Sequence, residues 1–311
     1  MEKIICVAGP TASGKTRLAV ALAKASDGEV LSCDSMQIYR GMEIGTAAPT
    51  LEEMQGVPHH MIGIISPAED FSVGKYVEMA EPILQDILSR GKTCVLCGGT
   101  GLYAESLLLG RSFAPCPQTG VREALEAQAA QAGIEPLVER LREVDPEAAA
   151  RLHPSDRRRI IRALEVYLET GETITAHDRK TKTLPPRHEA VWLGLTFENR
   201  QDLYARIDLR VEKMLEAGLL DEIRALLSSG VPATATAMQA IGYKEYVDAL
   251  LHGGDLSSAT ALVKQRSRNY AKRQLTWLRR NEQLHWLLQP GEPDFSAIFQ
   301  QARQIIPFFA Q

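Results

Sequence analysis

One eight-residue segment constrains the fold of this 311-residue chain more than any other feature of its sequence. Its residues are Gly9, Pro10, Thr11, Ala12, Ser13, Gly14, Lys15 and Thr16. They match the pattern G-x-x-x-x-G-K-[ST], which binds phosphate groups where it joins a strand to a helix. The apolar run Ile4–Ala8 precedes the motif and a helical pattern over residues 17–25 follows it. We therefore expect a phosphate-binding loop (P-loop) at residues 9–16.

The expected chemistry of this loop is that of an anion site. Its backbone N–H groups and the positive end of the following helix would face one phosphate group. Lys15 would add a mobile positive charge, and the Thr16 hydroxyl is the expected Mg²⁺ ligand. The motif specifies a polyphosphate rather than a nucleotide, so ATP and a prenyl diphosphate fit it equally well.

Short apolar runs alternate with helical patterns in the first hundred residues, which predicts an α/β fold with a parallel sheet. Strands are expected at 4–8, 29–33 and 93–97, and helices from residue 15 and over 73–90. Between 113 and 190 the sequence is rich in Ala, Glu, Arg and Pro, which predicts an inserted helical domain. Residues 190–197 read as a returning strand. The expected parts are 1–112, 113–190 and a mainly helical 191–311, in which one helix spans 200–228 and another spans the basic segment 264–280.

The distribution of charge leaves two interpretations open. The net charge of −4 argues against a nucleic-acid partner, since phosphate contacts need Lys and Arg. However, residues 264–280 contain seven basic residues and no acidic one, and a second cluster comprises Arg157, Arg158, Arg159 and Arg162. Taken alone, these clusters are either solvated helix faces or contacts to a polyanion.

Other features of the composition indicate a cytoplasmic protein without a disulfide framework. No apolar run is long enough to span a membrane, and the N-terminus lacks the pattern of a signal peptide. Cys94 and Cys97 lie in an apolar run that reads as a buried strand, and no second pair stands at zinc-ligand spacing. His59 and His60 are adjacent and lack an evident third ligand, which disfavours a metal site.

Asp34 follows the strand expected at 29–33, where an acidic residue often serves a P-loop. From the sequence alone it could act near a metal, act as a general base, or stabilise the following turn. The strand expected at 93–97 ends in glycines and Thr100 instead of a carboxylate, which weakens the interpretation as a kinase.

Several segments, in the same order along the chain, resemble the tRNA dimethylallyltransferases. They are GPTASGKT from residue 9, DSMQIYRGM from 34, GTA from 45, PHH from 58, DFS from 70, GGTGLY from 98, RALEV from 162, IGYKE from 241 and KRQLTWLR from 272. Together they span nearly the whole chain. One departure is Ala48, where the family often has a lysine, so a role of that lysine does not carry over.

The resemblance implies a P-loop α/β core whose helical insertion holds the anticodon stem-loop of tRNA. The substrates would be dimethylallyl diphosphate, bound with Mg²⁺, and adenine 37 of tRNAs with adenines at 36 to 38. Asp34 would be the base that takes a proton from the adenine N6 amine, Thr100 would orient the reacting groups, and Lys15 with Arg206 or Arg210 would stabilise the departing diphosphate. We expect a monomeric enzyme.

The same resemblance assigns the basic clusters to tRNA. The adenine must leave its stack to reach Asp34, and phosphate contacts elsewhere would offset that cost. The expected tRNA-binding residues are Asp34, Ser35, Met36, Gln37, Thr100, Arg122, Arg158, Arg159, Arg162, Gln239, Gly242, Tyr243, Lys244, Lys272, Arg273, Trp277 and Arg279.

Three other functions compete with tRNA prenyl transfer. A P-loop kinase or NTPase acting on a small molecule would cleave ATP. Prenyl transfer to free adenine nucleotides would need no stem-loop clamp, so the insertion argues against it. An RNA-binding protein with a vestigial P-loop is disfavoured because Lys15, Thr16 and Asp34 are all present.

Overall fold

A computed structural model describes residues 3–111, 113–114, 119–182 and 185–309 of the chain. Contacts divide the chain into two compact units: Met1–Leu108 with His188–Gln311, and Leu109–Arg187. The expected boundary between 112 and 113 includes residue 112, which lies outside the described residues. No helix in the described ranges is long and apolar enough to cross a membrane.

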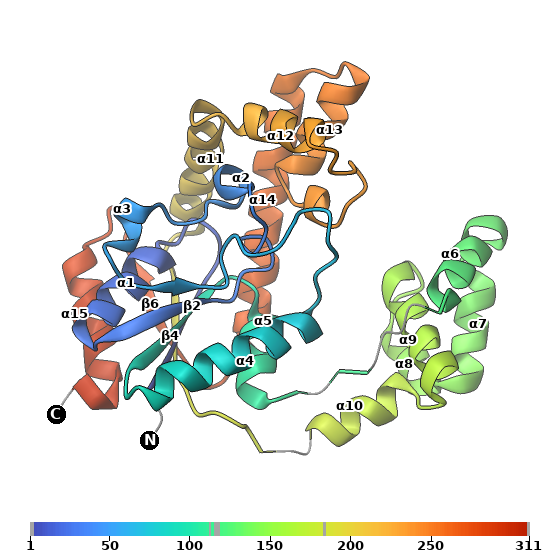
Figure 1. The fold of residues 1–311 in the computed structure, drawn as a ribbon, viewed down its shortest axis with the longest axis horizontal. Coiled ribbons are helices and arrows are strands. Elements are labelled where there is room, and N and C mark those ends of the chain that lie inside the picture. Colours follow the sequence, from blue (N-terminus) through green and yellow to red (C-terminus); the bar gives the residue numbers. More distant parts are fainter. Residues whose placement is uncertain (1–2, 112, 115–118, 183–184, 310–311) are drawn as a thin grey trace. The chain divides into compact units, whose positions relative to one another are not determined.

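The first unit is built on a parallel sheet of six strands within the described residues (Figure 1). The spatial order is β3-β2-β4-β1-β5-β6, and every recorded pairing is parallel. The strands are β1 (Ile4–Ala8), β2 (Gly28–Ser32), β3 (His59–His60), β4 (Thr93–Gly98), β5 (Val191–Phe197) and β6 (Leu284–Gln289). The predicted parallel sheet is confirmed.

Side-chain alternation along the strands builds a core on each face of this sheet. In β1, Ile4 and Cys6 pack in one apolar cluster, and Ile5 and Val7 pack in the other. Because both faces are covered, all five residues of β1 are buried, as is typical of a parallel sheet.

The helices of this unit cover both faces (Figure 1). Helix α1 (Lys15–Ala25) and α15 (Phe295–Ile305) pack on one face. On the other face lie α4 (Val73–Ser89) and α5 (Gly101–Leu109), whose cluster continues into the later helices. The remaining helices are α2 (Glu43–Thr46), α3 (Leu51–Met54), α11 (Arg200–Glu216), α12 (Leu219–Ser228), α13 (Tyr243–His252) and α14 (Leu256–Leu278), with short 3₁₀ turns at Ala237–Gln239 and Pro307–Phe309.

One expectation about the C-terminal part is wrong, and one strand was not predicted. The single helix expected over 200–228 is two helices, because Gly218 adopts a φ of 97° and ends the first one. The strand β6 was not expected, although its apolar residues Leu284 and Leu287 are buried and it pairs with β5 along its whole length.

The second unit is helical in its described part. Its helices are α6 (Val121–Ala132), α7 (Glu135–Val144), α8 (Pro146–Arg151), α9 (Arg157–Thr170) and α10 (Ile174–Lys182). Leu125, Leu137, Leu141, Ile161 and Leu164 form its own apolar core. The buried Asp145 ties α8 to α10, because its carboxylate accepts hydrogen bonds from Ala148 N and from both Thr175 N and Oγ1.

Candidate active site

Residues 9–16 connect β1 to α1, the setting that their motif requires. Gly14 has a φ of 90° and begins the helix, a conformation that favours glycine. A Cβ atom at Gly9 would lie 2.4 Å from the carbonyl oxygen of Leu195 in β5, so only glycine leaves room for that strand. The loop therefore lies tightly against the carboxyl end of the sheet.

Lys15 folds back over this loop. Its Nζ donates a hydrogen bond to the carbonyl oxygen of Pro10 over 2.7 Å. Burial lowers the pKa of the Lys15 ammonium, and the positive charge of Arg210 acts in the same direction, whereas Asp34 opposes the shift. The loop thus holds a partly desolvated cation that an incoming anion would stabilise.

Asp34 follows β2, and its carboxylate plays a part in the turn that begins there. Its Oδ1 accepts hydrogen bonds from Met36 N over 2.9 Å and from Gln37 N over 3.3 Å. The other oxygen, Oδ2, accepts no hydrogen bond from the described residues. One oxygen therefore fixes the orientation of the carboxylate and leaves the other available as a base. Stabilising the turn and acting as a general base are thus compatible roles for Asp34.

Thr100 lies beside Asp34 because β4 is the neighbour of β2 in the sheet. The Thr100 Oγ1 accepts a hydrogen bond from Ser35 N over 3.2 Å and lies 3.4 Å from Ser35 Oγ. The two loops that follow β2 and β4 are thus joined at their tips, next to the P-loop that follows β1.

The two arginines expected to hold a diphosphate reach this region from α11. Arg206 is exposed, and its Nε donates to the carbonyl oxygen of Ala12 over 3.3 Å. Arg210 is half-buried one turn later; burial lowers the pKa of its guanidinium and the charge of Asp34 raises it. Arg206 and Arg210 therefore flank the P-loop, and Arg210 is within electrostatic range of both Lys15 and Asp34.

Two residues of α14 that the sequence analysis did not single out complete the site. The buried Gln274 accepts a hydrogen bond from Thr11 N over 3.0 Å and donates one to Gly99 O over 2.9 Å. Tyr270 lies one helical turn earlier. Burial raises its pKa to about 12, Asp34 adds to the shift, and hydrogen bonds with Thr100 and Gln274 oppose it. Two signals were available: Gln274 lies in the family-like segment KRQLTWLR, and Tyr270 precedes it at i, i+4 spacing.

The contact between α14 and the loop after β4 leaves no room for side chains at two glycines. A Cβ atom at Gly99 would lie 2.1 Å from Gln274 Nε2, and one at Gly101 would lie 2.3 Å from Trp277 Cδ1. Thr100, between these glycines, is therefore placed directly by the packing of α14.

The sequence as a whole matches known families. Residues 37–281 match the family model described as IPP transferase, and residues 2–63 match one described as isopentenyl transferase. The chain belongs to the IPP transferase family. Among its relatives, a tRNA dimethylallyltransferase of Geobacter metallireducens is 46% identical over 292 residues, 94% of each chain. A tRNA dimethylallyltransferase of Acetivibrio thermocellus is 42% identical over 289 residues, 92% of each chain.

Solved structures of this family share the fold. The tRNA isopentenylpyrophosphate transferase of Bacillus halodurans matches with a TM-score of 0.73 at 39% identity, covering 100% of this chain and 98% of that one. A eukaryotic dimethylallyltransferase acting on tRNA matches with a TM-score of 0.81 at 28% identity, covering 98% of this chain and 77% of that one. The expected family, and with it the P-loop-type α/β fold carrying a helical insertion, is confirmed.

The basic residues of α14 and of its C-terminal end divide into two groups. In the first half of the helix, Lys264, Arg266 and Arg268 form ion pairs with Glu212, Glu245 and Asp208. In the second half, the exposed residues Lys272, Arg273 and Arg279 have no ion pair with any described residue. Lys272, Arg273 and Arg279 are all expected tRNA-binding residues. Trp277, another expected tRNA-binding residue in the same stretch, is 37% exposed.

The arginines expected to bind tRNA in the helical unit differ in their surroundings. Arg122 and Arg162 both donate to the buried carboxylate of Glu165. Burial would raise the pKa of Glu165, but the two guanidinium groups outweigh it and lower the pKa to about 2. Arg158 and Arg159 are exposed on the first turn of α9, where Arg159 pairs with Asp156 over 3.3 Å. Arg158 and Arg159 are thus open to a partner, whereas Arg122 and Arg162 also hold the fold together.

Gly242 and Tyr243, two of the predicted tRNA-binding residues, are both buried in this structure. Tyr243 is fully buried, and its hydroxyl donates to Glu222 Oε1 over 2.6 Å. Gly242 is buried as well, and its N–H donates to Glu245 Oε2. Within the same predicted group, Gln239 donates to Ala233 O, and Lys244 is exposed without a recorded partner among the described residues. Lys244 is therefore the exposed member of this group, and Gln239 is half-buried.

The residues after Asp34 are held by internal contacts as well. Gln37 accepts a hydrogen bond from Ser32 Oγ and donates to Ala47 O over 3.1 Å, and Met36 packs against the core. The backbone and turn of residues 34–37 are thus fixed before any ligand binds. Ala48 donates its N–H to Glu43 O.

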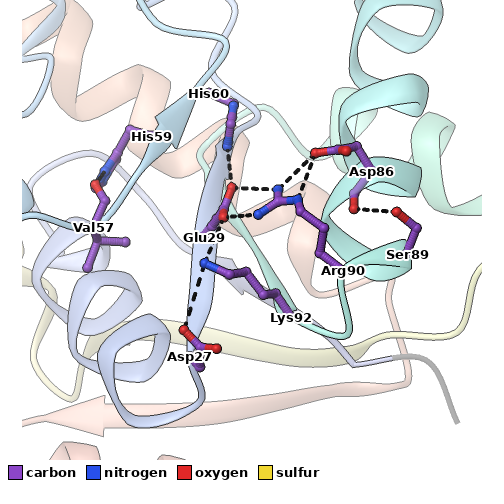
Figure 2. A network of polar contacts seen from close by, with 9 residues as sticks. All are labelled: Asp27, Glu29, Val57, His59, His60, Asp86, Ser89, Arg90 and Lys92. Atoms are coloured by element: carbon purple, nitrogen blue, oxygen red, sulfur yellow. Dashed lines mark hydrogen bonds and ion pairs between the residues drawn. The ribbon is translucent and has the colours of Figure 1, made fainter.

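Of the two adjacent histidines, His60 joins a network of polar contacts around Glu29, near the start of β2 (Figure 2). His60 Nε2 lies 2.8 Å from Glu29 Oε2, and Arg90 and Lys92 pair with the same buried carboxylate. The hydrogen bond from Arg90 lowers the pKa of Glu29 far below its usual value. His59 instead turns its Nδ1 toward Val57 O. The two histidines point to different partners, and no group of three metal-binding side chains lies in the described residues.

Proposed function

We propose that this chain transfers a dimethylallyl group from dimethylallyl diphosphate to N6 of adenine 37 in tRNA. The observation that carries the proposal is the position of Asp34 and Thr100 beside the Lys15-bearing loop, at one edge of the sheet. The membership of the IPP transferase family and the relatives named tRNA dimethylallyltransferase support it.

The P-loop would hold the diphosphate of the prenyl donor. The loop N–H groups other than that of Thr11, which donates to Gln274, would face one anion together with the start of α1. Lys15 and Arg210 add two partly desolvated charges. Arg206 is positioned on the outer side of the loop by its bond to Ala12. These groups stabilise negative charge on the diphosphate as the allylic carbon–oxygen bond breaks.

The hydroxyl of Thr16 is a suitable ligand for Mg²⁺, which is part of the proposed reaction. The Thr16 hydroxyl forms no hydrogen bond with the described residues. Thr16 lies in the first turn of α1, beside the expected position of the diphosphate. Such a site uses substrate phosphates and water for its remaining ligands, so it needs no cluster of carboxylates. Bound there, the ion would neutralise charge on the leaving diphosphate.

Asp34 would complete the reaction on the RNA side. As the adenine N6 forms its bond to the allylic carbon, Asp34 Oδ2 accepts the proton that N6 loses, and diphosphate leaves with the bonding electrons. The hydroxyl of Thr100 and the neutral hydroxyl of Tyr270 lie next to this carboxylate and can orient the amine.

That the protein is cytoplasmic and monomeric remains a prediction from the sequence.

Incubation of the purified full chain with radiolabelled dimethylallyl diphosphate and an anticodon stem-loop RNA tests this proposal. We expect label in RNA that carries adenine 37 and none in the same RNA with guanine at that position. Excess AMP should not compete. Cleavage of ATP that is independent of RNA, together with no transfer of label, would instead support the small-molecule kinase or NTPase.

A further inference from the structure

A small pocket lies between α11 and α14, on the outer side of the P-loop. It has a volume of about 210 Å³. Its lining residues are Arg200, Tyr204, Lys272, Leu275, Thr276 and Arg279. Tyr204 and Leu275 pack in the same small apolar cluster as Ala12 of the P-loop, which places the pocket close to the active site but on another face of α14 from Gln274.

The charge of this pocket is uniformly positive. Three of its six lining residues are cations, and none is acidic. Arg200, Lys272 and Arg279 have no ion pair with a carboxylate in the described part of the chain. Lys264, Arg266 and Arg268 of α14 are neutralised by carboxylates, whereas Arg200, Lys272 and Arg279 are not. These three charges are therefore available to a ligand.

Tyr204 adds an unused donor to these charges. Its hydroxyl oxygen is buried and forms no hydrogen bond with the described residues. The ammonium of Lys272 lies 5.9 Å from the centre of its ring. Because buried hydroxyl groups normally have a partner, the Tyr204 hydroxyl is a donor available to a ligand that enters the pocket. An oxyanion satisfies both the hydroxyl and the cations.

The surroundings favour a phosphate of a polynucleotide over a free small anion. Arg273 and Arg280 follow Lys272 and Arg279 directly in the sequence, and both are exposed without an ion pair in the described part of the chain. Trp277 in the same stretch exposes 37% of its surface. Charges in a row with an exposed aromatic ring match a nucleic-acid backbone and an unstacked base.

We propose that Arg200, Tyr204, Lys272 and Arg279 bind one backbone phosphate of the RNA substrate, an inference that rests on the proposed function. Arg200 and Tyr204 of α11 are then RNA-binding residues in addition to those expected from the sequence. Since α11 also carries Arg206 and Arg210, one helix contacts the RNA backbone and the diphosphate site.

The test measures the affinity of the full chain for an anticodon stem-loop RNA over a series of salt concentrations. Arg200→Ala should weaken binding about tenfold. It should also reduce the slope of log K against log salt, by no more than about 0.7 to 0.9, the value for one whole phosphate contact, because Lys272 and Arg279 remain at the same phosphate. Tyr204→Phe should weaken binding about threefold and leave the slope unchanged, because it removes a neutral donor.

Arg224→Ala is the matched control, because Arg224 is an exposed arginine of α12 that pairs with Asp221 and lies outside the pocket. It should keep wild-type affinity and slope. Inorganic diphosphate should bind Arg200→Ala as it binds the wild type, and the melting temperatures should agree.

Each remaining outcome counts against a specific claim. If Arg200→Ala binds the RNA with wild-type affinity and slope while the wild type transfers the prenyl group, the pocket proposal is overturned and the proposed function stands. If Arg200→Ala weakens diphosphate binding as much as RNA binding, the pocket serves the P-loop and the proposal is also overturned. If the wild type binds no RNA, both claims fail.

Discussion

The side-chain carbonyl of Gln274 accepts a hydrogen bond from the backbone N–H of Thr11 over 3.0 Å. The same amide group donates to Gly99 O over 2.9 Å, so one side chain joins the P-loop, the loop that carries Thr100 and the basic helix α14. The helix that would contact RNA therefore also sets the spacing of the catalytic loops.

Gln274→Leu should reduce kcat more than it affects RNA binding. Leucine keeps most of the buried volume but loses both hydrogen bonds, and small misplacement of reacting groups is costly. We expect kcat to fall about 10 to 100-fold, while KM for tRNA changes little. Gln265→Leu is the control, because Gln265 is exposed on the same helix. Steady-state kinetics measure kcat and KM for both variants. A normal kcat for Gln274→Leu would show that the amide is not needed to position the catalytic loops.

Tyr270→Phe tests whether a neutral hydroxyl beside Asp34 assists the reaction. With a pKa raised to about 12 by burial, Tyr270 stays protonated at neutral pH and can donate to the reacting groups. Removing the hydroxyl should lower kcat about tenfold, corresponding to one lost hydrogen bond. Tyr246→Phe, which removes a hydroxyl bonded to Thr260 in the same unit, should leave kcat unchanged. Equal rates for the wild type and Tyr270→Phe would exclude this role.

The affinity for inorganic diphosphate should fall as pH rises. Burial lowers the pKa of Lys15, so the free enzyme loses this charge at a lower pH than an exposed lysine would. The protonated form binds the anion, and binding raises the pKa again; affinity is therefore full below the pKa of the free enzyme and is lost above it. Calorimetry in buffers of different ionisation enthalpy should show proton uptake on binding. Lys15→Arg should bind without proton uptake, because arginine remains charged, and equal uptake in both proteins would contradict the assignment.

Glu165 should stabilise the helical unit in a pH-dependent way. Its pKa is lowered from 4.5 to about 2, so its contribution is complete above about pH 4.5 and is lost as pH falls toward 2. The shift corresponds to at most about 3 kcal/mol. Hydrogen exchange of α9 in the full chain should therefore be faster in Glu165→Gln than in the wild type at pH 7, and the difference should shrink below pH 4.5. A difference that is constant with pH would mean that the ion pairs with Arg122 and Arg162 do not stabilise the unit.

Local patterns predicted the parts of this molecule that depend on nearby residues. The P-loop, the strand before it, and the placement of Asp34 and Thr100 after parallel strands could all be inferred, because in a parallel sheet the carboxyl ends of neighbouring strands meet at one edge. The break between α11 and α12 was missed because a single glycine, Gly218, interrupts an otherwise continuous helical pattern.

Contacts between distant segments could not be inferred. Lys264, Arg266 and Arg268 look the same in the sequence as Lys272 and Arg279, and they differ because Glu212, Glu245 and Asp208 come from other helices. Likewise, the burial of Tyr243 depends on Glu222 and on Gly45, where a Cβ atom would lie 2.4 Å from the tyrosine ring. Tertiary packing, rather than local pattern, decides which polar residues remain free for a substrate.

The most direct test of the account is single-turnover transfer by Asp34→Ala with saturating RNA and radiolabelled dimethylallyl diphosphate. The account predicts a loss of rate of at least about 10²-fold, the contribution of a general base, while inorganic diphosphate still binds because Lys15 and the loop remain. Transfer at the wild-type rate by Asp34→Ala would contradict the assignment of Asp34 as the base and with it the proposed mechanism.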